Sequence, residues 1–222
     1  GRAGALAPLH PFYKETMALF RSWDIPIVGG APVGVSGSYA WLKAVGSLLS
    51  LDPRLVDEVA EEERARAQAM VAAQPLSGRI FVTGYEGSEL AYARLLVEAG
   101  AEVPYVSTSI GQDPLVLPDE MWLRARGTQE VVYRKSLEDD VAALDKYPPD
   151  LVFGTTPFCS VAKERGIPAM YFTNQLASRP FFLSVGMAAT LGFIRQTLER
   201  GERYQWMQDF FAGAANEEAT HA

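Results

Sequence analysis

Short apolar runs rich in β-branched residues alternate, along most of the chain, with segments whose apolar residues recur at helical spacing. This alternation is typical of a parallel β-sheet, because the crossover between parallel strands usually passes over a face of the sheet as a helix. The pattern predicts strands at residues 25–28, 79–83, 103–106, 130–133, 151–153 and 168–172. We therefore expect an α/β protein with Rossmann-like parallel sheets flanked by helices.

Start signals and apolar spacing predict the helices between these strands. One helix is expected from Ser38, and a second, charged helix from Asp52 and Pro53, a capping residue followed by proline at the first helical position. Ser136 and Asp139 have the spacing of a capping box at the start of another helix. Further helices are expected from residue 88 and over 157–165, 181–200 and 204–211.

The chain divides in two where the charged helix gives way to a more regular series of strands and helices, at residues 74–78. We predict a partial α/β domain with a charged helix over residues 1–76. A Rossmann-like α/β domain with closing helices is predicted over 77–212. Residues 213–222 contain too little apolar surface to stay ordered, and a disordered tail is expected there.

Composition narrows the classes of protein. The chain has 222 residues, 48% of them hydrophobic, and a net charge of -7 without a long basic run, so nucleic acid is not expected as a partner. The apolar run 181–194 falls short of the roughly 20 residues that cross a bilayer, so no transmembrane segment is expected. A single cysteine, Cys159, favours the reducing cytoplasm. Because the first residue is Gly1, we expect that an amino-terminal portion is missing.

The common catalytic motifs are absent from the sequence: it contains no phosphate loop, no nucleophile elbow, no zinc-protease motif and no paired cysteines. The glycine-rich loop 30–37 follows a predicted strand and leads into a helix, whose amino terminus favours an anion. Candidate anion-binding residues are Gly34, Ser36, Gly37 and Ser38. An ordinary tight junction that uses glycine for its backbone freedom remains the alternative.

Small and polar residues follow three of the predicted strands. The strand at 79–83 is followed by Gly84, Tyr85 and Glu86, the strand at 151–153 is followed after one glycine by Thr155 and Thr156, and the strand at 168–172 is followed by Thr173 and Asn174. The carboxyl ends of parallel strands lie at one edge of a sheet, where open α/β sheets bind their ligands. The sequence therefore predicts a ligand crevice at this edge.

Metal chemistry is not indicated. An iron–sulfur cluster needs about four ligands, mostly cysteines, and Cys159 is the only thiol in the chain. A lone cysteine near a helix start is more often a small buried hydrophobic residue than a ligand. His10 and His221 are far apart in the sequence and do not have the spacing of a metal site.

Several segments resemble a known family. The string 31–42, APVGVSGSYAWL, is similar to the Pro-x-Gly-x-x-x-Thr-x-x-Leu element of the nitrogenase component 1-like family, with Ser38 where many members have threonine. The acidic stretch from residue 51 to 66 resembles the helix that follows this element. Segments 132–140, 154–157, 171–174 and 178–180 resemble the chlorophyllide reductase branch of the family.

The resemblance implies nitrogenase component 1-type domains in the catalytic component of an ATP-dependent, ferredoxin-driven oxidoreductase that reduces the C7–C8 double bond of a chlorin ring in bacteriochlorophyll synthesis. It implies a 4Fe–4S cluster in the full complex, with ligands that lie outside this chain. The implied partners are a paralogous Z-type subunit, an ATP-using iron–sulfur reductase component and a tetrapyrrole substrate. The chain alone is then a scaffold and a wall of the substrate pocket.

By position, the loop 173–180 resembles the nitrogenase loop that approaches the bound cofactor. The resemblance therefore makes Asn174, Ser178 and Arg179 the preferred substrate contacts, with Arg179 facing a propionate of the pigment. The sequence departs from the family after Arg179, where Phe181 begins an aromatic run in place of smaller residues. A helix-capping or interface role for Arg179 remains the alternative.

Other functions stay open from the sequence. Within the family they are a subunit of dark-operative protochlorophyllide reductase and a nitrogenase cofactor-assembly scaffold. From another class, a non-catalytic small-molecule-binding α/β module fits the absence of catalytic groups, whereas a nucleotide-sugar transferase is disfavoured because basic residues do not accompany the glycine loops. The proton donor is undecided among Asp113, Glu86 and His10.

Overall fold

The computed structural model describes residues 4–9, 14–174 and 180–210. Its strands are β1 (Ile80–Gly84), β2 (Tyr105–Thr108), β3 (Glu130–Tyr133), β4 (Leu151–Gly154) and β5 (Ala169–Tyr171). Its helices are α1 (Lys14–Ser22), α2 (Gly34–Leu48), α3 (Pro53–Ala73), α4 (Glu89–Glu98), α5 (Leu117–Arg124), α6 (Leu137–Lys146), α7 (Thr156–Glu164) and α9 (Leu183–Glu199), followed by a 3₁₀ turn (Gly201–Tyr204). Residues 205–210 continue as helix.

The five strands form one parallel sheet in the order β3-β2-β1-β4-β5. Val82 of β1 lies opposite Val106 of β2, and Phe81 lies opposite Val152 of β4. The chain therefore builds the sheet outward from β1 in one direction and then returns to add β4 and β5 on the other side. The parallel sheet confirms the α/β fold class, and it places the topological switch point between β1 and β4.

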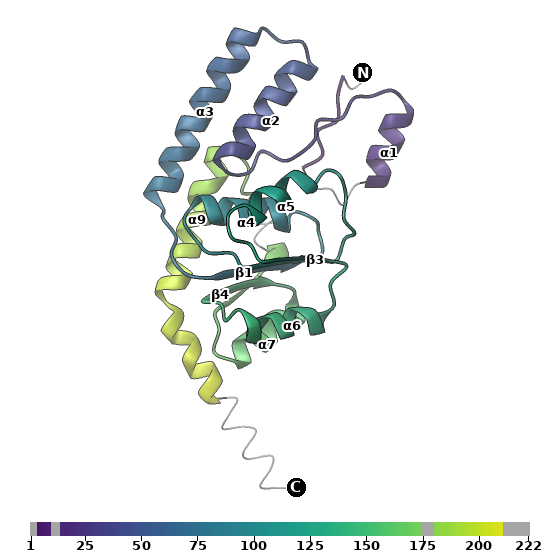
Figure 1. Cartoon of the computed structure of the whole chain (residues 1–222). Coiled ribbons are helices and arrows are strands. Elements are labelled where there is room, and N and C mark those ends of the chain that lie inside the picture. The colour runs from purple at the N-terminus through teal and green to yellow at the C-terminus, as the bar shows by residue number, and fades with distance from the viewer. Residues whose placement is uncertain (1–3, 10–13, 175–179, 211–222) are drawn as a thin grey trace.

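Helices cover both faces of the sheet, as Figure 1 shows. On one face, α4, α5 and α9 bury a core against inward residues of the strands such as Ile80, Val82 and Phe153. On the other face, α6 and α7 pack over Phe81 and Val152. Because both faces are buried, the central strands β1 and β4 are apolar along almost their whole length rather than alternating.

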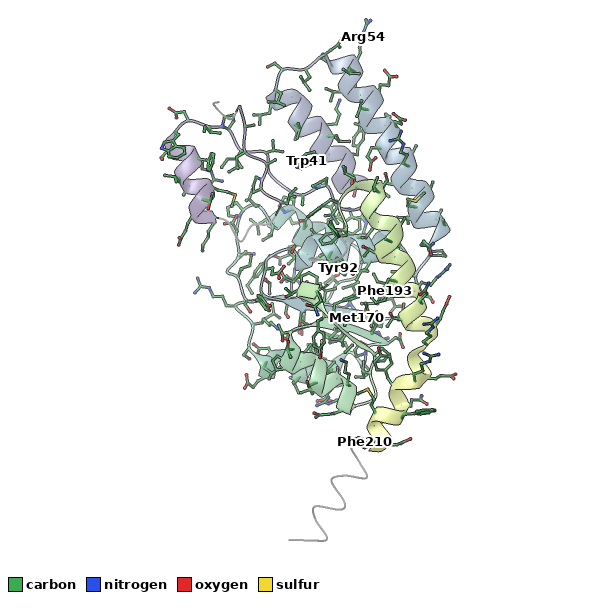
Figure 2. All side chains as sticks on the ribbon, turned by 180° about the vertical axis from the view of Figure 1, so that it is seen from behind. Trp41, Arg54, Tyr92, Met170, Phe193 and Phe210 are labelled. Atoms are coloured by element: carbon green, nitrogen blue, oxygen red, sulfur yellow. The ribbon has the colours of Figure 1, made fainter. Side chains whose placement is uncertain are left out.

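Tyr92 of α4 is the aromatic centre of the larger core. Its ring meets the rings of Phe153, Phe172 and Phe181 edge-on, with centroids 5.0–5.4 Å apart. Figure 2 places Tyr92 and Met170 in the interior, with Phe193 on the long helix α9 beside them. These contacts fix α4 over β4 and β5, and they join the end of β5 to the segment that enters α9.

Helices α2 and α3 form an antiparallel hairpin that projects from the sheet layers, with Arg54 near its far end (Figures 1 and 2). Helix α9 packs against α3 and α2 and runs along the molecule toward Phe210. Val33 and Ala67, from the hairpin side, share the larger core with the sheet. The division at residue 76 stays a prediction.

Several boundaries differ from the sequence expectation. The strand predicted at 25–28 is reduced to an isolated bridge between Leu6 and Ile27. Helix α2 begins at Gly34 rather than Ser38, because the loop before it turns earlier than the apolar spacing suggests. Helices α1 and α5 were not predicted. The capping box of Ser136 and Asp139 is confirmed, with both reciprocal bonds present.

Candidate functional site

The carboxyl edge of the sheet collects three of the predicted loops. Gly84 ends β1, Thr155 and Thr156 follow β4, and Thr173 and Asn174 follow β5. Since β1 and β4 are neighbours at the switch point, the helices that follow them leave on opposite faces, and the loops between strand and helix diverge there. This edge is the candidate site.

A side-chain hydrogen bond ties two of these loops together. The Thr173 hydroxyl and the Tyr85 hydroxyl lie 2.8 Å apart, joining the loop after β1 to the loop after β5 across the end of β4. The Tyr85 side chain is 47% exposed, so the bond lies at the surface of the edge. Asn174 lies in the short helical segment after β5, whereas Ser178 and Arg179 fall outside the described residues.

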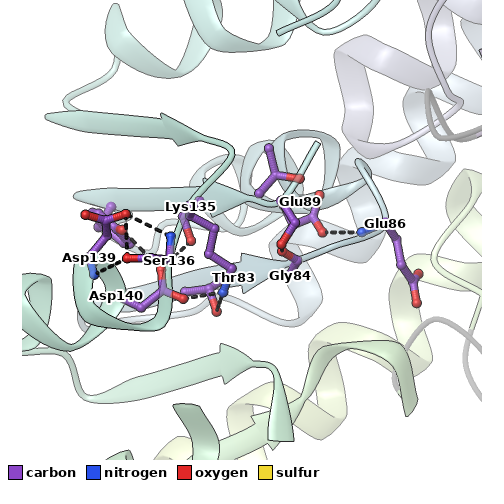
Figure 3. A network of polar contacts seen from close by, with 12 residues as sticks. Thr83, Gly84, Glu86, Glu89, Lys135, Ser136, Asp139 and Asp140 are labelled. Atoms are coloured by element: carbon purple, nitrogen blue, oxygen red, sulfur yellow. Dashed lines mark hydrogen bonds and ion pairs between the residues drawn. The ribbon is translucent and has the colours of Figure 1, made fainter. Parts of the chain in front are cut away.

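Glu89 lies directly beneath the loop after β1. It is the first residue of α4, it is fully buried, and its Oε1 accepts the backbone N–H of Glu86 at 2.9 Å (Figure 3). Gly84 allows this placement, because a Cβ there would collide with Glu89 Oε1 and with the ring of Phe172. The other carboxyl oxygen, Oε2, has no hydrogen-bond partner among the described residues.

Burial changes the proton affinity of Glu89. Desolvation raises its pKa from 4.5 to about 7, against the opposing effect of the backbone N–H groups near its carboxyl. The carboxyl therefore exchanges its proton near neutral pH. From the sequence, Glu86 of this loop is a possible proton donor, whereas Glu89 was not expected to hold a proton.

A second buried polar cluster lies on the opposite face of the same edge (Figure 3). Lys135, which follows β3, pairs with Asp140 of α6, and both side chains are almost fully buried. Asp140 Oδ1 also accepts the hydroxyls of Ser107 at 2.6 Å and Tyr105 at 3.1 Å. Lys135 Nζ donates to Thr83 Oγ1 at 3.4 Å, so the cluster connects α6 to the ends of β1 and β2.

The predicted anion-binding loop already holds an anion from the chain itself. The Glu98 carboxylate of α4 accepts the backbone N–H groups of Val35 and Ser36 and the Ser36 hydroxyl. Arg94 donates to the same hydroxyl at 2.8 Å, and Gly34 has a φ of 72° at the turn into α2. The helix amino terminus thus binds a carboxylate within the chain, and we place no external anion there.

The remaining residues of that loop serve packing. Gly37 and Ser38 lie buried within the first two turns of α2, and the Ser38 hydroxyl has no hydrogen-bond partner in the part of the chain that the structure describes. A Cβ at Gly37 would come within 3.4 Å of the Ala31 carbonyl oxygen. Both positions therefore fit the alternative of a tight turn into a helix, here without a strand before it.

Cys159 does not fit an iron–sulfur ligand in this structure. Its side chain is fully buried in the core between α7 and the sheet, and its Sγ lies 3.3 Å from the Met170 carbonyl oxygen. Burial raises the pKa of this thiol to about 11. The described residues contain no group of three or more His, Cys, Asp or Glu arranged to hold a metal ion. We therefore derive no chemical step through a metal in this chain.

Sequence reasoning missed Glu89, Glu98 and the pair of Lys135 with Asp140. Glu89 and Asp140 lie in the first turns of helices, where acidic side chains are common because of the helix dipole, and Glu98 and Lys135 are charged residues that no local pattern distinguishes. A signal was present for Glu89, since it follows Gly84 and Gly87 in a strand-to-helix loop. Burial, which distinguishes it from a solvated acid, depends on Phe172, 83 residues along the chain from Glu89.

Comparison with known proteins identifies the family. The family model described as nitrogenase component 1 type oxidoreductase matches residues 1–199. The chain belongs to this family. The nitrogenase component 1 family typically binds iron–sulfur clusters, whereas no ligand group for one occurs among the residues described for this member. None of the helices in the described part of the chain is long and apolar enough to cross a membrane.

Curated members of the family match most of the chain. It is 44% identical to the chlorophyllide reductase 52.5 kDa chain of Cereibacter sphaeroides over 95% of its length, and 43% identical to that of Rhodobacter capsulatus over 94%. The chain spans 42% of the length of each. A subunit of the light-independent protochlorophyllide reductase of Methylocella silvestris is 29% identical over 68% of the chain and 29% of its own length.

A solved structure shares the family fold at low sequence identity. The structure titled "Nitrogenase Cp1 at pH 6.5" aligns with a TM-score of 0.64 and 18% identity, covering 83% of this chain and 42% of that one. At this identity the likeness shows the fold alone. It agrees with the parallel five-stranded sheet described above.

Proposed function

We propose that this chain is part of the Y-type subunit in the catalytic component of a chlorophyllide a reductase, which reduces the C7–C8 double bond of the chlorin ring. The 44% and 43% identity to two chlorophyllide reductase chains, each over nearly the whole of this chain, carries the proposal. The reaction adds two electrons and two protons to the ring. This chain contributes shape and hydrogen bonds rather than electrons.

Within that complex, the carboxyl edge of the sheet forms one wall of the substrate pocket. The linked side chains of Tyr85 and Thr173, with Thr155 and Thr156 beside them at the end of β4, offer hydroxyl groups to a ligand at the switch point. Asn174, Gly84 and Glu86 complete the wall from the same loops. Ser178 and Arg179 remain proposed substrate contacts outside the described residues.

The redox centre belongs to other parts of the assembly. We propose a 4Fe–4S cluster whose ligands lie outside this chain, a paralogous Z-type subunit that shares the cluster, and an ATP-using iron–sulfur reductase as the electron donor. One buried thiol in the whole sequence supports this division. The same single cysteine supports a cytoplasmic location.

Reconstitution tests the proposal. The complete subunit that contains this chain, assembled with its Z-type partner and the ATP-using reductase, is mixed with chlorophyllide a, ATP and dithionite, and the pigment spectrum is followed. We expect ATP-dependent loss of the chlorophyllide absorption and formation of a bacteriochlorin. A complex that leaves chlorophyllide unchanged, although its iron content and ATP hydrolysis are normal, would contradict the proposal.

A protochlorophyllide reductase is the second candidate, because a subunit of the Methylocella silvestris enzyme is also a relative. The same assay with protochlorophyllide separates the two. Reduction of protochlorophyllide and not of chlorophyllide would favour this second function. The lower identity, 29% against 44%, makes the opposite result the expected one.

A further inference from the structure

The carboxyl of Glu89 is buried at a position where an apolar side chain would be more favourable for stability. The side chain is fully buried, Oε1 has a backbone partner and Oε2 has none among the described residues. Burying a carboxyl group away from water is unfavourable, whereas a leucine of similar size would pack there without that cost. A polar side chain in such a place indicates a role beyond filling space.

The contacts of Glu89 are with the turn after β1. Its Oε1 accepts the Glu86 N–H, and its carboxyl occupies the space where Gly84 has no Cβ. Gly87 has a φ of 86°, a conformation that other residues rarely adopt, so the chain reverses sharply over the carboxyl. Glu89 therefore fixes the path of residues 84–87 from the buried side of the turn (Figure 3).

The same carboxyl reaches the second loop of the edge. The ring of Phe172 borders the space beside Gly84 that the Glu89 carboxyl fills, and the next residue, Thr173, shares a hydrogen bond with the Tyr85 hydroxyl. Tyr85 lies between Gly84 and Glu86, the two residues that Glu89 contacts. One side chain thus bonds to the loop after β1 and lies beside Phe172, the residue before Thr173.

The geometry points to Glu89 as a positioning residue for substrate binding: its carboxyl holds the turn of residues 84–87 and, through Tyr85 and Thr173, the start of the loop after β5 in the shape that receives the ring. The inference rests on the proposed function. It assigns Glu89 no contact with the substrate, because the side chain is fully buried beneath the loop.

Two substitutions separate hydrogen bonding from packing. Glu89→Gln keeps an oxygen that accepts the Glu86 N–H, whereas Glu89→Leu keeps the volume and loses the acceptor. In the complete complex, we expect Glu89→Leu to raise KM for chlorophyllide a about tenfold, the equivalent of one lost hydrogen bond. Its kcat should stay within about twofold, and Glu89→Gln should restore KM to within about twofold of the natural protein.

A second measurement does not depend on the substrate. Hydrogen exchange of the Glu86 amide in the assembled complex should be about tenfold faster in Glu89→Leu than in Glu89→Gln, because only leucine frees that N–H. Glu58→Leu, which removes an exposed carboxylate from α3, serves as the control and should change neither KM nor exchange.

The outcomes distinguish this inference from the proposed function. An unchanged KM in folded Glu89→Leu, or a Glu89→Gln variant as impaired as Glu89→Leu, overturns the positioning role. Equal exchange of the Glu86 amide in the two variants overturns it as well. If the natural complex does not reduce chlorophyllide at all, the proposed function fails, and the exchange of Glu86 still decides whether Glu89 holds the turn.

Discussion

At the scale of single residues, the pKa of Glu89 makes stability depend on pH. Its folded pKa of about 7 lies above the ordinary value of 4.5, so between these values the unfolded chain releases a proton that the folded chain keeps. The free energy of unfolding therefore falls as pH rises through this range, by roughly 3 kcal/mol from this group alone.

The variant Glu89→Gln removes this dependence. We expect its free energy of unfolding, measured by urea denaturation, to gain on that of the natural protein as pH rises from about 4.5 to 7 and to change little in relation to it above that range. Parallel stability curves for the two proteins across these pH values would show that Glu89 does not titrate in this way.

Position 84 requires glycine because neighbouring side chains leave no space for a Cβ, and not because of its backbone angle. A Cβ there would collide with Glu89 and with the ring of Phe172, so Gly84→Ala should destabilise the fold by about 1–3 kcal/mol. Gly192→Ala is the matched control, since a Cβ on α9 would meet only Gln74 at 3.8 Å. That change should stabilise the protein by about 0.5–1 kcal/mol, because alanine favours helix.

Thermal denaturation of both alanine variants checks the sign of each effect. A lower melting temperature for Gly84→Ala together with a higher one for Gly192→Ala is the expected pair. Equal melting temperatures for the two variants would mean that the space beside Gly84 is not as tightly filled as the structure shows.

At the scale of secondary structure elements, the start of α9 depends on α3. Ser184 donates its backbone N–H and its hydroxyl to the buried carboxylate of Glu63, and the preceding residue, Leu183, has a φ of 54°. This is an unfavourable backbone conformation for leucine, and the bonds to Glu63 offset its cost. Glu63 thus plays the part of a helix cap from a neighbouring helix.

Loss of that cap should be far more costly than loss of its exposed neighbour. We expect Glu63→Ala to lower the free energy of unfolding by about 2–3 kcal/mol, because two buried donors lose their acceptor. Glu62→Ala removes only an exposed pair with Arg66 and should cost less than about 0.5 kcal/mol. Similar urea midpoints for the two variants would contradict the capping role.

The sequence predicted the strands that are apolar along most of their length. The apolar runs at 79–83, 130–133 and 151–153 became strands because both faces of the sheet are covered. Helix α1 was not predicted, and in the structure it is a short helix of nine residues with Met17 as its only buried residue. The run 25–28 has the apolar content of a strand but forms only a bridge, since its pairing partner is the short segment around Leu6.

At the scale of the whole molecule, the grouping of loops at the carboxyl edge of the sheet could be predicted from topology. The contacts and the burial of side chains at that edge could not. Parallel strands require that Gly84, Thr155 and Thr173 lie at the same edge, so their grouping followed from the strand assignments. The hydrogen bond between Tyr85 and Thr173 and the burial of Glu89 depend on packing between segments about 85 residues apart. Periodicity carries no information about such distant contacts.

The same distinction applies to the loop at Gly34 and Ser36. Its sequence indicates a helix amino terminus that favours an anion, and in the structure the carboxylate of Glu98, more than 60 residues away, accepts the N–H groups there. Local pattern thus predicts the chemistry of a site, whereas the identity of the bound group depends on the tertiary fold.

The most direct test of the central claim, that this edge is a wall of the substrate pocket, is the KM for chlorophyllide a of two tryptophan variants in the complete complex. Thr156→Trp places a large ring at the end of β4, and Ser160→Trp places one at an exposed position a turn further along α7. We predict at least a tenfold higher KM for Thr156→Trp and a KM within about twofold of the natural value for Ser160→Trp. An unchanged KM for a folded and assembled Thr156→Trp complex would contradict the claim.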